Sequence, residues 1–261
     1  MKKIPKIKIG VCAASYVGYE LLSFVLRQKH KIEFVATYKH DESGYEEKIV
    51  ALCRKYRVKL LHRISAHQPE LTEEIKTRSI DLMLLLWWPE IIREPAIGSV
   101  KIGWTNLHPS LLPFNRGKHG YFWAIVEGTP FGATIHLINE QIDAGNILFQ
   151  EQIPIDITDT GESLYKKSRS VLMGLFKKNY HRLVNLDFSP VKQSIKGRFT
   201  SHFGKELDSA TCIDLNKTYK AIDLINIIRG RTFWNGDAAF FYKDGIKYHI
   251  RTEIKKAPPA K

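Results

Sequence analysis

Three polar side chains in the middle of the chain could act together on an amine: Asn106, His108 and Asp143. Asn106 and His108 lie two positions apart at the end of an expected strand, so strand geometry places both side chains on one face. An imidazole can carry a proton near neutral pH, and an asparagine amide can donate a hydrogen bond to a developing oxyanion. Asp143 lies in an expected turn and offers one carboxylate. Together the three could accept the proton of an attacking amine and stabilise the charge on the carbonyl oxygen.

The spacing of Asn106 and His108 also fits an ordinary structural histidine on a strand. Pro109 and Pro113 restrict the chain that follows, which indicates a fixed segment rather than a mobile loop. Three further histidines, His62, His119 and His136, could do the same chemistry. We interpret His136, in the apolar strand 134–137, as structural or as support for the site, whereas His119 lies near a helix start that could bind an anion or remain a solvated loop.

A longer set of motifs in this region resembles the formyltransferase family. The matching runs are, in order, 106–113 (NLHPSLLP), 116–117 (RG), 132–136 (GATIH) and 143–147 (DAGNI). Members of that family transfer a formyl group from 10-formyltetrahydrofolate to an amine. The resemblance implies that His108 handles the proton, that Asn106 stabilises the oxyanion, and that Asp143 orients His108 or a bridging water. It implies neither a metal nor a covalent intermediate, because the formyl donor is already activated.

Composition sets limits on location and partners. The chain has 261 residues and a net charge of +13. No stretch approaches the ~20 apolar residues of a membrane span, and no apolar signal segment follows the basic residues 1–6. The three cysteines, Cys12, Cys53 and Cys212, form neither a disulfide framework nor a metal pattern. We therefore expect a cytoplasmic protein with no membrane partner.

The excess positive charge fits either nucleic acid or small polyanions. A nucleotide diphosphate and the polyglutamate tail of folate are examples of such polyanions. Because the lysines are dispersed, as in 166–167 and 177–178, we favour the small molecules and expect no nucleic-acid partner.

Short apolar strands alternate with helical periodicity along the first two thirds of the chain. This pattern predicts an α/β fold with a doubly wound, mostly parallel sheet, which corresponds to the Rossmann-like core of formyltransferases. The expected strands are 7–12, 32–37, 58–61, 81–86, 131–137 and 147–155. We expect Ser15 to cap the first helix, and further helices over 45–56, 71–77 and 163–184. Gly10 and Gly18 do not make the dinucleotide fingerprint, which argues against NAD binding.

The pattern in the last quarter of the sequence predicts a small α+β appendage. A loop is expected over 187–198, then a helix over 218–230 capped by Asn216, then a hairpin of strands 238–242 and 247–254 around a turn at 243–246. We therefore expect a catalytic domain over 1–186, the appendage over 187–254 and a disordered tail over 255–261. By resemblance, the appendage is the surface of a homodimer.

Trp87 and Trp88 end the strand 81–86 at the sheet edge where α/β folds bind ligands. In formyltransferases the corresponding segment lines the pterin pocket, with main-chain groups reading the amide edge of the pterin. The candidate residues for 10-formyltetrahydrofolate are Leu86, Trp87 and Trp88, faced by Ile138, Asn139, Ile142 and Asp143. One of the two tryptophans could instead pack in the core.

The acceptor amine is indicated by the end of the chain. The residues after 184 are too few for the barrel domain of methionyl-tRNA formyltransferases, and 12–17 (CAASYV) replaces the phosphate-binding loop of glycinamide ribonucleotide formyltransferases. Residues 227–236, 239–241 and 247–250 resemble the tail of nucleotide-sugar N-formyltransferases, in which an aromatic residue stacks on the base. The candidate residues for the acceptor are Phe233 or Trp234 at the base, Arg229 or Arg231 at the diphosphate, and Arg116, Gly117, Lys118 and His119.

The family tail often reads Phe-Pro-Pro after the threonine, whereas this chain has Phe233-Trp234-Asn235, which leaves the base and its stacking residue open. These aromatic residues could also form an ordinary core. The sequence thus predicts formylation of the primary amine of a nucleotide-linked amino sugar, for example a dTDP-4-amino-4,6-dideoxyhexose, for surface polysaccharides such as the O-antigen of lipopolysaccharide. The alternatives are GDP or UDP as the nucleotide, a methionyl-tRNA formyltransferase-like enzyme, and a non-catalytic folate- or RNA-binding relative.

Overall fold

The computed structural model describes residues 7–28, 30–40, 43–194, 199–234 and 236–257. The chain forms two compact units that interleave along the sequence. The first unit comprises 1–108, 134–150 and 172–193, and the second comprises 109–133, 151–171 and 194–261. The expected domain boundary between residues 186 and 187 stays a prediction.

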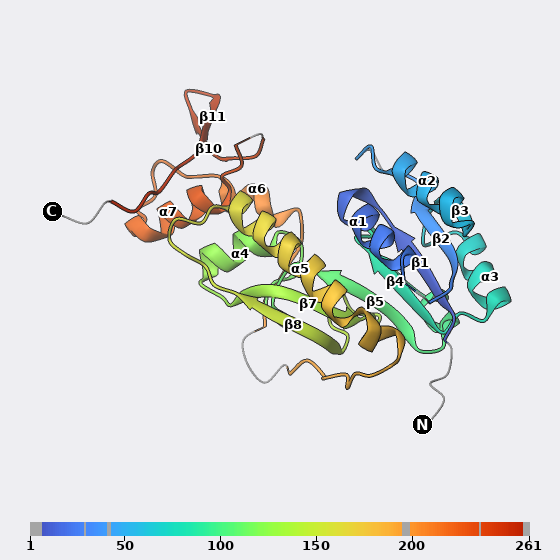
Figure 1. Cartoon of the computed structure of the whole chain (residues 1–261). Coiled ribbons are helices and arrows are strands. Elements are labelled where there is room, and N and C mark those ends of the chain that lie inside the picture. The colour runs from blue at the N-terminus through green and yellow to red at the C-terminus, as the bar shows by residue number, and fades with distance from the viewer. Residues whose placement is uncertain (1–6, 29, 41–42, 195–198, 235, 258–261) are drawn as a thin grey trace. The chain divides into compact units, whose positions relative to one another are not determined.

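A seven-stranded sheet forms the framework, in the order β3-β2-β1-β4-β5-β7-β8 (Figure 1). Its strands are β1 (Ile9–Ala13), β2 (Ile32–Tyr38), β3 (Lys59–Ile64), β4 (Leu82–Leu86), β5 (Gly103–His108), β7 (Phe131–Leu137) and β8 (Ile147–Ile153). The pairs among β1 to β5 are parallel, and β5 pairs with β7 in the antiparallel sense. The predicted mostly parallel α/β sheet is therefore confirmed.

Helices cover both faces of the sheet in the first unit. Alternate strand residues such as Cys12, Met83 and Leu85 pack in one core with Leu71 and Ile75 of α3 (Pro69–Arg78). α1 (Ser15–Leu26) and α2 (Glu46–Tyr56) pack against β1 and β2, and a short 3-10 turn, η1 (Ile97–Ser99), precedes β5. Every residue of β4 is buried, because this strand is covered on both faces.

The start of α1 differs from the prediction. Ser15 is the first helical residue, the N-cap position is Ala14, and no side chain caps the helix. The β1–α1 connection is too short for Ser15 to precede the helix, since β1 ends at Ala13. The helix has an apolar face toward the core, because Gly18, Leu21 and Val25 are all buried.

The second unit contains α4 (Gly120–Glu127), α6 (Glu206–Thr211), α7 (Ala221–Gly230), the strand pair β6 (Arg116–Gly117) and β9 (Ser201–His202), and the hairpin β10 (Ala239–Lys243) and β11 (Ile246–Ile250). α5 (Gly161–Val184) has residues in both units. Its start is capped, since Thr160 Oγ1 accepts the N–H of Ser163 and Ser163 Oγ accepts the N–H of Thr160.

Two expectations for this unit are corrected. Asn216 does not cap α7, because the helix begins only at Ala221, with Lys220 at the N-cap position, and Asn216 lies in a preceding turn where its N–H donates to Asp214 Oδ1. β11 ends at Ile250 rather than 254, because Ile250 pairs with Ala239, the first residue of β10.

The hairpin turn at 243–246 is confirmed, and Asp244 and Gly245 both take positive φ there, as a two-residue type I′ turn requires. In the loop expected over 187–198, Val191 forms an isolated bridge with Ile147, and residues 195–198 lie outside the described residues. Of the tail expected over 255–261, residues 258–261 lie outside them too. Among the helices of the described residues, none is both long and apolar enough to cross a membrane.

Gly18 permits the close approach of α1 to β4. A Cβ added there would lie 2.6 Å from the backbone oxygen of Leu86, whereas one added at Gly174, an exposed glycine of α5, would meet nothing within 4 Å. We expect Gly18→Ala to lower the free energy of unfolding by about 1–3 kcal/mol. Gly174→Ala should raise it by about 0.5–1 kcal/mol, since alanine lowers the entropy of the unfolded helix segment. Urea unfolding of both variants measures this contrast, and equal effects would contradict it.

Candidate functional site

β5 and β7 bring the three predicted catalytic residues together within the first unit. Asn106 pairs with His136 and His108 pairs with Thr134 across the two strands. Asp143, in the turn that follows β7, has Oδ2 at 3.5 Å from His108 Nδ1 and Oδ1 at 3.4 Å from Asn106 Nδ2. The side chains of His108 and Asp143 are 7% and 13% exposed, so their interaction is only weakly screened by water.

His136 joins this cluster. Its Nδ1 lies 2.8 Å from the backbone oxygen of Leu137, which can only accept, so Nδ1 carries a hydrogen. Its Nε2 lies 3.4 Å from Asn106 Nδ2 and 3.5 Å from Asp143 Oδ1. The Asn106 amide is thus oriented by two long contacts rather than tightly bound. Strand alternation across the β5–β7 pair is the sequence signal for this position, and it agrees with the interpretation of His136 as a supporting residue.

The turn that carries Asp143 has little conformational freedom. Asp143 takes a φ of 49°, a left-handed conformation that aspartate tolerates better than most residues. Gly145 follows two positions later, and a Cβ there would lie 1.8 Å from the backbone oxygen of Leu137. No side chain other than hydrogen fits at position 145, so this glycine lets the turn close against the end of β7.

The segment after β4 places the two tryptophans differently. Trp88 is buried in the core of the first unit, with its ring 5.4 Å from that of Tyr38. Its indole N–H is buried with no acceptor among the described residues. Trp87 is only half-buried and takes a φ of 64°. The backbone oxygen of Leu86 accepts the N–H of Ala14 at 3.2 Å, which ties the end of β4 to the end of β1.

The opposite candidate segment follows β7. The backbone N–H of Ile138 donates to Trp104 O at 2.8 Å, so this residue continues the sheet edge. Asn139 is exposed, and its side-chain oxygen accepts the N–H of Gln141 at 3.1 Å. Ile142 is also exposed, although its side chain is apolar.

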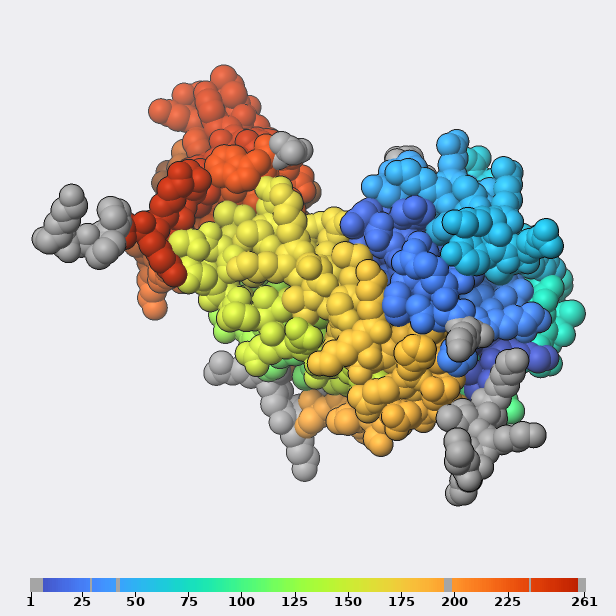
Figure 2. Space-filling model, viewed as in Figure 1, coloured from blue at the N-terminus to red at the C-terminus, as the bar shows by residue number. Residues whose placement is uncertain are grey.

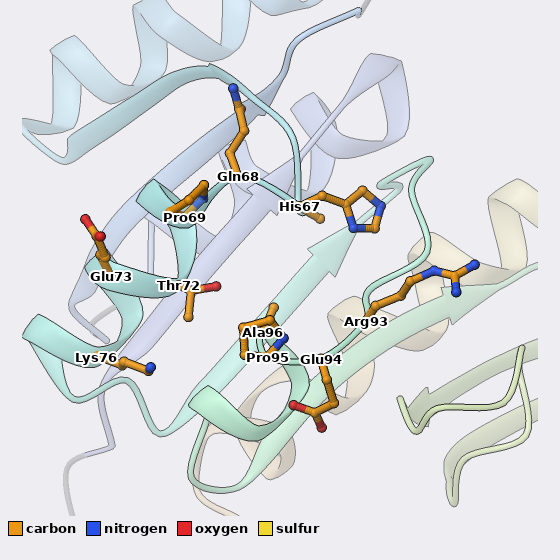
Figure 3. Close-up of a pocket in the computed structure, with 11 residues that line it drawn as sticks. His67, Gln68, Pro69, Thr72, Glu73, Lys76, Arg93, Glu94, Pro95 and Ala96 are labelled. Carbon is orange, nitrogen blue, oxygen red and sulfur yellow. The ribbon is translucent and has the colours of Figure 1, made fainter.

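A surface pocket of about 420 Å³ lies in the first unit beside α3. Figure 3 shows the hydroxyl of Thr72 and the amino group of Lys76 turned toward Ala96 across the hollow, with Glu73 turned away. His67, Lys76 and Arg93 line it, and the structure gives their side chains no hydrogen-bond or ion-pair partner among the described residues. The lining thus carries the cationic groups of Lys76 and Arg93 together with the carboxylates of Glu73 and Glu94, of which Glu94 accepts the N–H of Gly98.

The predicted acceptor residues lie in the second unit. Arg116 and Gly117 form β6, and a Cβ at Gly117 would lie 2.2 Å from the backbone oxygen of His202 on β9. Lys118 is exposed, while His119 stands at the N-cap position of α4 with a φ of 61°. Burial, and then the positive charges of Arg231 and Lys118, lower the pKa of His119. His119 is thus a neutral side chain in a positive field at neutral pH.

The two candidate arginines have different surroundings. Arg229 Nη1 donates to the backbone oxygens of Asp156, Ile157 and Asp159 at 2.9 to 3.3 Å, so this group holds a turn. Arg231 is 8% exposed, and its Nη1 contacts Asp237 Oδ2 at 2.5 Å. Its Nε is buried without an acceptor among the described residues. These contacts favour Arg231 over Arg229 as the group that meets an anion.

Phe233 and Trp234 also differ in their surroundings. The Phe233 ring packs 5.3 Å from Tyr121 and 6.4 Å from Tyr165, so it belongs to an aromatic cluster. Tyr121 connects this cluster to the candidate residue His119, because the Tyr121 hydroxyl lies 2.9 Å from His119 Nδ1. Burial raises the pKa of Tyr121 to about 12. The Trp234 ring is 55% exposed, and its backbone N–H donates to Glu162 Oε2 at 3.1 Å. Sequence reasoning did not find Tyr121 or Tyr165, because aromatic residues on helices usually pack in cores.

The described residues contain no group of three or more His, Cys, Asp or Glu that could hold a metal ion. The arrangement in the first unit can hold and move a proton beside a hydrogen-bond donor.

Two family models match the chain. One, described as Formyl transferase, matches residues 24–176, and the other, described as N-formyltransferase dimerization C-terminal domain, matches residues 206–256. Among curated relatives, the bifunctional polymyxin resistance protein ArnA of Wigglesworthia glossinidia brevipalpis is 29% identical over 97% of this chain, which spans only 39% of that relative's length. A methionyl-tRNA formyltransferase of Lachnospira eligens is 28% identical over 86% of this chain and 71% of its own.

Solved structures share the fold. A 4-N formyltransferase from Francisella tularensis superposes with a TM-score of 0.82 at 20% identity, covering 97% of this chain and 99% of that one. The N-formyltransferase from Helicobacter canadensis, in complex with folinic acid and dTDP-3-aminofucose, has a TM-score of 0.65 at 23% identity, covering 85% and 80%. Because the first family model spans more than half of the residues, the predicted resemblance is confirmed, and the chain belongs to the formyl transferase family.

Proposed function

We propose that this chain transfers a formyl group from 10-formyltetrahydrofolate to the primary amine of a nucleotide-linked amino sugar. The observation that carries the chemistry is the cluster of Asn106, His108 and Asp143, with His136 behind it. The cluster combines a proton acceptor, a hydrogen-bond donor for the oxyanion and a carboxylate that orients the imidazole. An amine that attacks a formyl carbon requires these groups.

Each side chain of the cluster has one step to perform. 10-formyltetrahydrofolate supplies, when bound, a formyl carbon that is already activated. With His108 Nδ1 directed at Asp143, Nε2 is the nitrogen that accepts the proton of the attacking amine. Asn106 Nδ2 exchanges its long contacts of 3.4 Å for a hydrogen bond to the developing oxyanion. Asp143 stabilises the imidazolium that forms, and this imidazolium can return the proton to the folate nitrogen as the bond between that nitrogen and the formyl carbon breaks.

The first unit also contains the proposed folate site. We place the pterin against Leu86, Trp87 and Trp88, where the buried indole N–H of Trp88 would gain an acceptor. Ile138, Asn139 and Ile142 would close the opposite side. Lys76 and Arg93 of the pocket beside α3 offer a place for the carboxylates of the glutamyl tail, since Ala66 and Ala96 of its wall share a core with Trp88.

The second unit contains the proposed acceptor site. The exposed Trp234 ring is the group that stacks on the nucleotide base, because Phe233 is already packed against Tyr121 and Tyr165. Arg231, with Lys118 and His119, would meet the diphosphate. Arg116 and Gly117 shape the strand that leads to them, while a binding role for Arg229 stays a weaker proposal. A dTDP-linked amino sugar is the favoured acceptor, and the product would serve surface polysaccharide assembly in the cytoplasm.

We further propose a homodimer that forms through the hairpin. Tyr242, Ile246 and Tyr248 are 43% to 57% exposed on β10 and β11, and exposed apolar groups of this kind mark association surfaces. Figure 2 shows the hairpin, in red, standing at the surface of the second unit. The dimerization model that matches residues 206–256 supports this proposal.

A methionyl-tRNA formyltransferase-like activity is the second candidate, and the similarity to the Lachnospira eligens enzyme favours it. Binding of tRNA would weaken steeply with added salt, whereas turnover of a nucleotide sugar would fall less.

The reaction itself is tested with purified protein, 10-formyltetrahydrofolate and a panel of dTDP-, GDP- and UDP-amino sugars and methionyl-tRNA, read by mass spectrometry. We expect one formyl group to be gained by a nucleotide sugar. His108→Ala should lower kcat by about 10²–10⁴-fold, because the proton acceptor is lost, and should leave folate binding intact. His62→Ala, a histidine of β3 paired with Glu46, serves as the control. If methionyl-tRNA alone gained a formyl group, the methionyl-tRNA formyltransferase-like activity would replace nucleotide-sugar formylation as the proposed function.

Base stacking is tested at Trp234. Trp234→Ala should raise the acceptor KM by about 5- to 150-fold, which corresponds to ~1–3 kcal/mol of stacking. Trp234→Phe should restore most of the affinity, because it keeps an aromatic face. An unchanged KM in Trp234→Ala would remove this residue from the acceptor site.

The pocket beside α3 is tested with folates of two tail lengths. In the double variant Lys76→Ala and Arg93→Ala, we expect KM for triglutamyl 10-formyltetrahydrofolate to rise roughly fivefold at low salt, with little change for the monoglutamate. Lys31→Ala, which removes an exposed lysine paired with Glu33, is the control for loss of a positive charge at a residue that does not line the pocket. An equal rise for both tail lengths would rule out tail binding in this pocket.

A further inference from the structure

Residues 191–193 run beside the turn that carries Asp143. The N–H of Val191 donates to Ile147 O and the N–H of Ile147 donates to Val191 O, both at 2.8 Å. Residue 193 follows two positions later, where strand alternation returns to the same face. This segment lies between the two matched stretches, 24–176 and 206–256, so neither family model covers it.

Gln193 makes the most specific contact of the segment. Its side-chain Nε2 donates to Asp143 O at 2.8 Å and to Gly145 O at 2.7 Å. The two hydrogens of one amide group are thereby directed at the two backbone oxygens on either side of Ala144. The side chain is 5% exposed, so these bonds do not compete with bulk water.

The turn needs such a restraint. Asp143 holds a left-handed φ of 49°, and Gly145 is pressed against Leu137 O. Within the turn itself, the N–H of Ala144 makes only a long contact of 3.4 Å to Gln141 O. The direction of the Asp143 carboxylate therefore depends on a group outside the turn, and Gln193 is bound to the backbone of Asp143 itself.

We propose that Gln193 is a positioning residue for formyl transfer. It fixes the backbone of the turn so that the Asp143 carboxylate stays 3.5 Å from His108 Nδ1 and 3.4 Å from Asn106 Nδ2. Gln193 touches no reacting atom, so its main effect is on the rate of the chemical step, with only a small effect on the KM of either substrate. The inference rests on the proposed function, since the rate concerned is that of formyl transfer.

The variants Gln193→Met and Gln193→Ala test the proposal. Met keeps the length of the side chain without its donors, and Ala removes the side chain altogether. We expect each to lower kcat by about 10²-fold, with KM for both substrates within threefold, because small misplacements of catalytic groups have effects of this size. Lys192→Ala, at the exposed neighbouring position, is the matched control and should leave kcat unchanged. A raised KM with unchanged kcat would overturn the proposal.

A double-mutant cycle separates positioning from general stability. In an Asp143→Asn background, Gln193→Met should cost no further activity, because the carboxylate that it positions is gone. If Gln193→Met lowered kcat by the same factor in the Asp143→Asn background as in the wild type, Gln193 would not act through Asp143 and the proposal would be wrong.

Hydrogen exchange in the substrate-free protein gives a readout that does not need activity. Gln193→Met should raise the exchange of peptides spanning 143–147, and Lys192→Ala should not. Unchanged exchange would overturn the positioning role. A wild-type protein that formylates no acceptor would instead count against the proposed function, and the exchange result would still decide whether Gln193 holds the turn.

Discussion

The antiparallel pairing of β5 with β7 is the interaction on which the site depends. The other pairs among β1 to β5 are parallel, and this reversal returns the chain beside the strand that carries Asn106 and His108. The register sets His136 opposite Asn106, and the turn after β7 then brings Asp143 to the same face. A slip of one residue would move every side chain of β7 to the other face and would separate His136 from the carboxylate.

The position of Asp143 follows from a second constraint, which is close packing rather than hydrogen bonding within the turn. Gly145 allows the chain to pass the end of β7 where any Cβ would collide with Leu137 O. The turn is then fixed from outside, by the Ile147–Val191 bridge and by Gln193. The sheet supplies Asn106 and His108 from a rigid strand, so Asp143 is the member of the cluster whose position depends on distant residues.

Much of this arrangement was predictable from the sequence, because it is encoded locally. The apolar run of β4 and the two-residue spacing of Asn106 and His108 follow from strand geometry, and the hairpin follows from Asp244-Gly245. Gln193 could not be found in this way, since one glutamine in a polar segment has no periodicity. The cap expected at Asn216 was wrong because this residue lies in an Asx turn at Asp214 and the helix begins only at Ala221.

Arg229 and Arg231 show why residue type alone does not determine a binding role. Both are buried arginines at the end of one helix, and the sequence offers no reason to prefer either. Arg229 donates to three backbone oxygens, whereas Arg231 has a buried Nε without an acceptor among the described residues. A buried donor of this kind is costly unless a ligand completes it. The same reasoning distinguishes Phe233, which already packs against tyrosines, from Trp234, which is exposed. Of the two arginines and of the two aromatic residues, the one with unused contacts is the better candidate for a ligand.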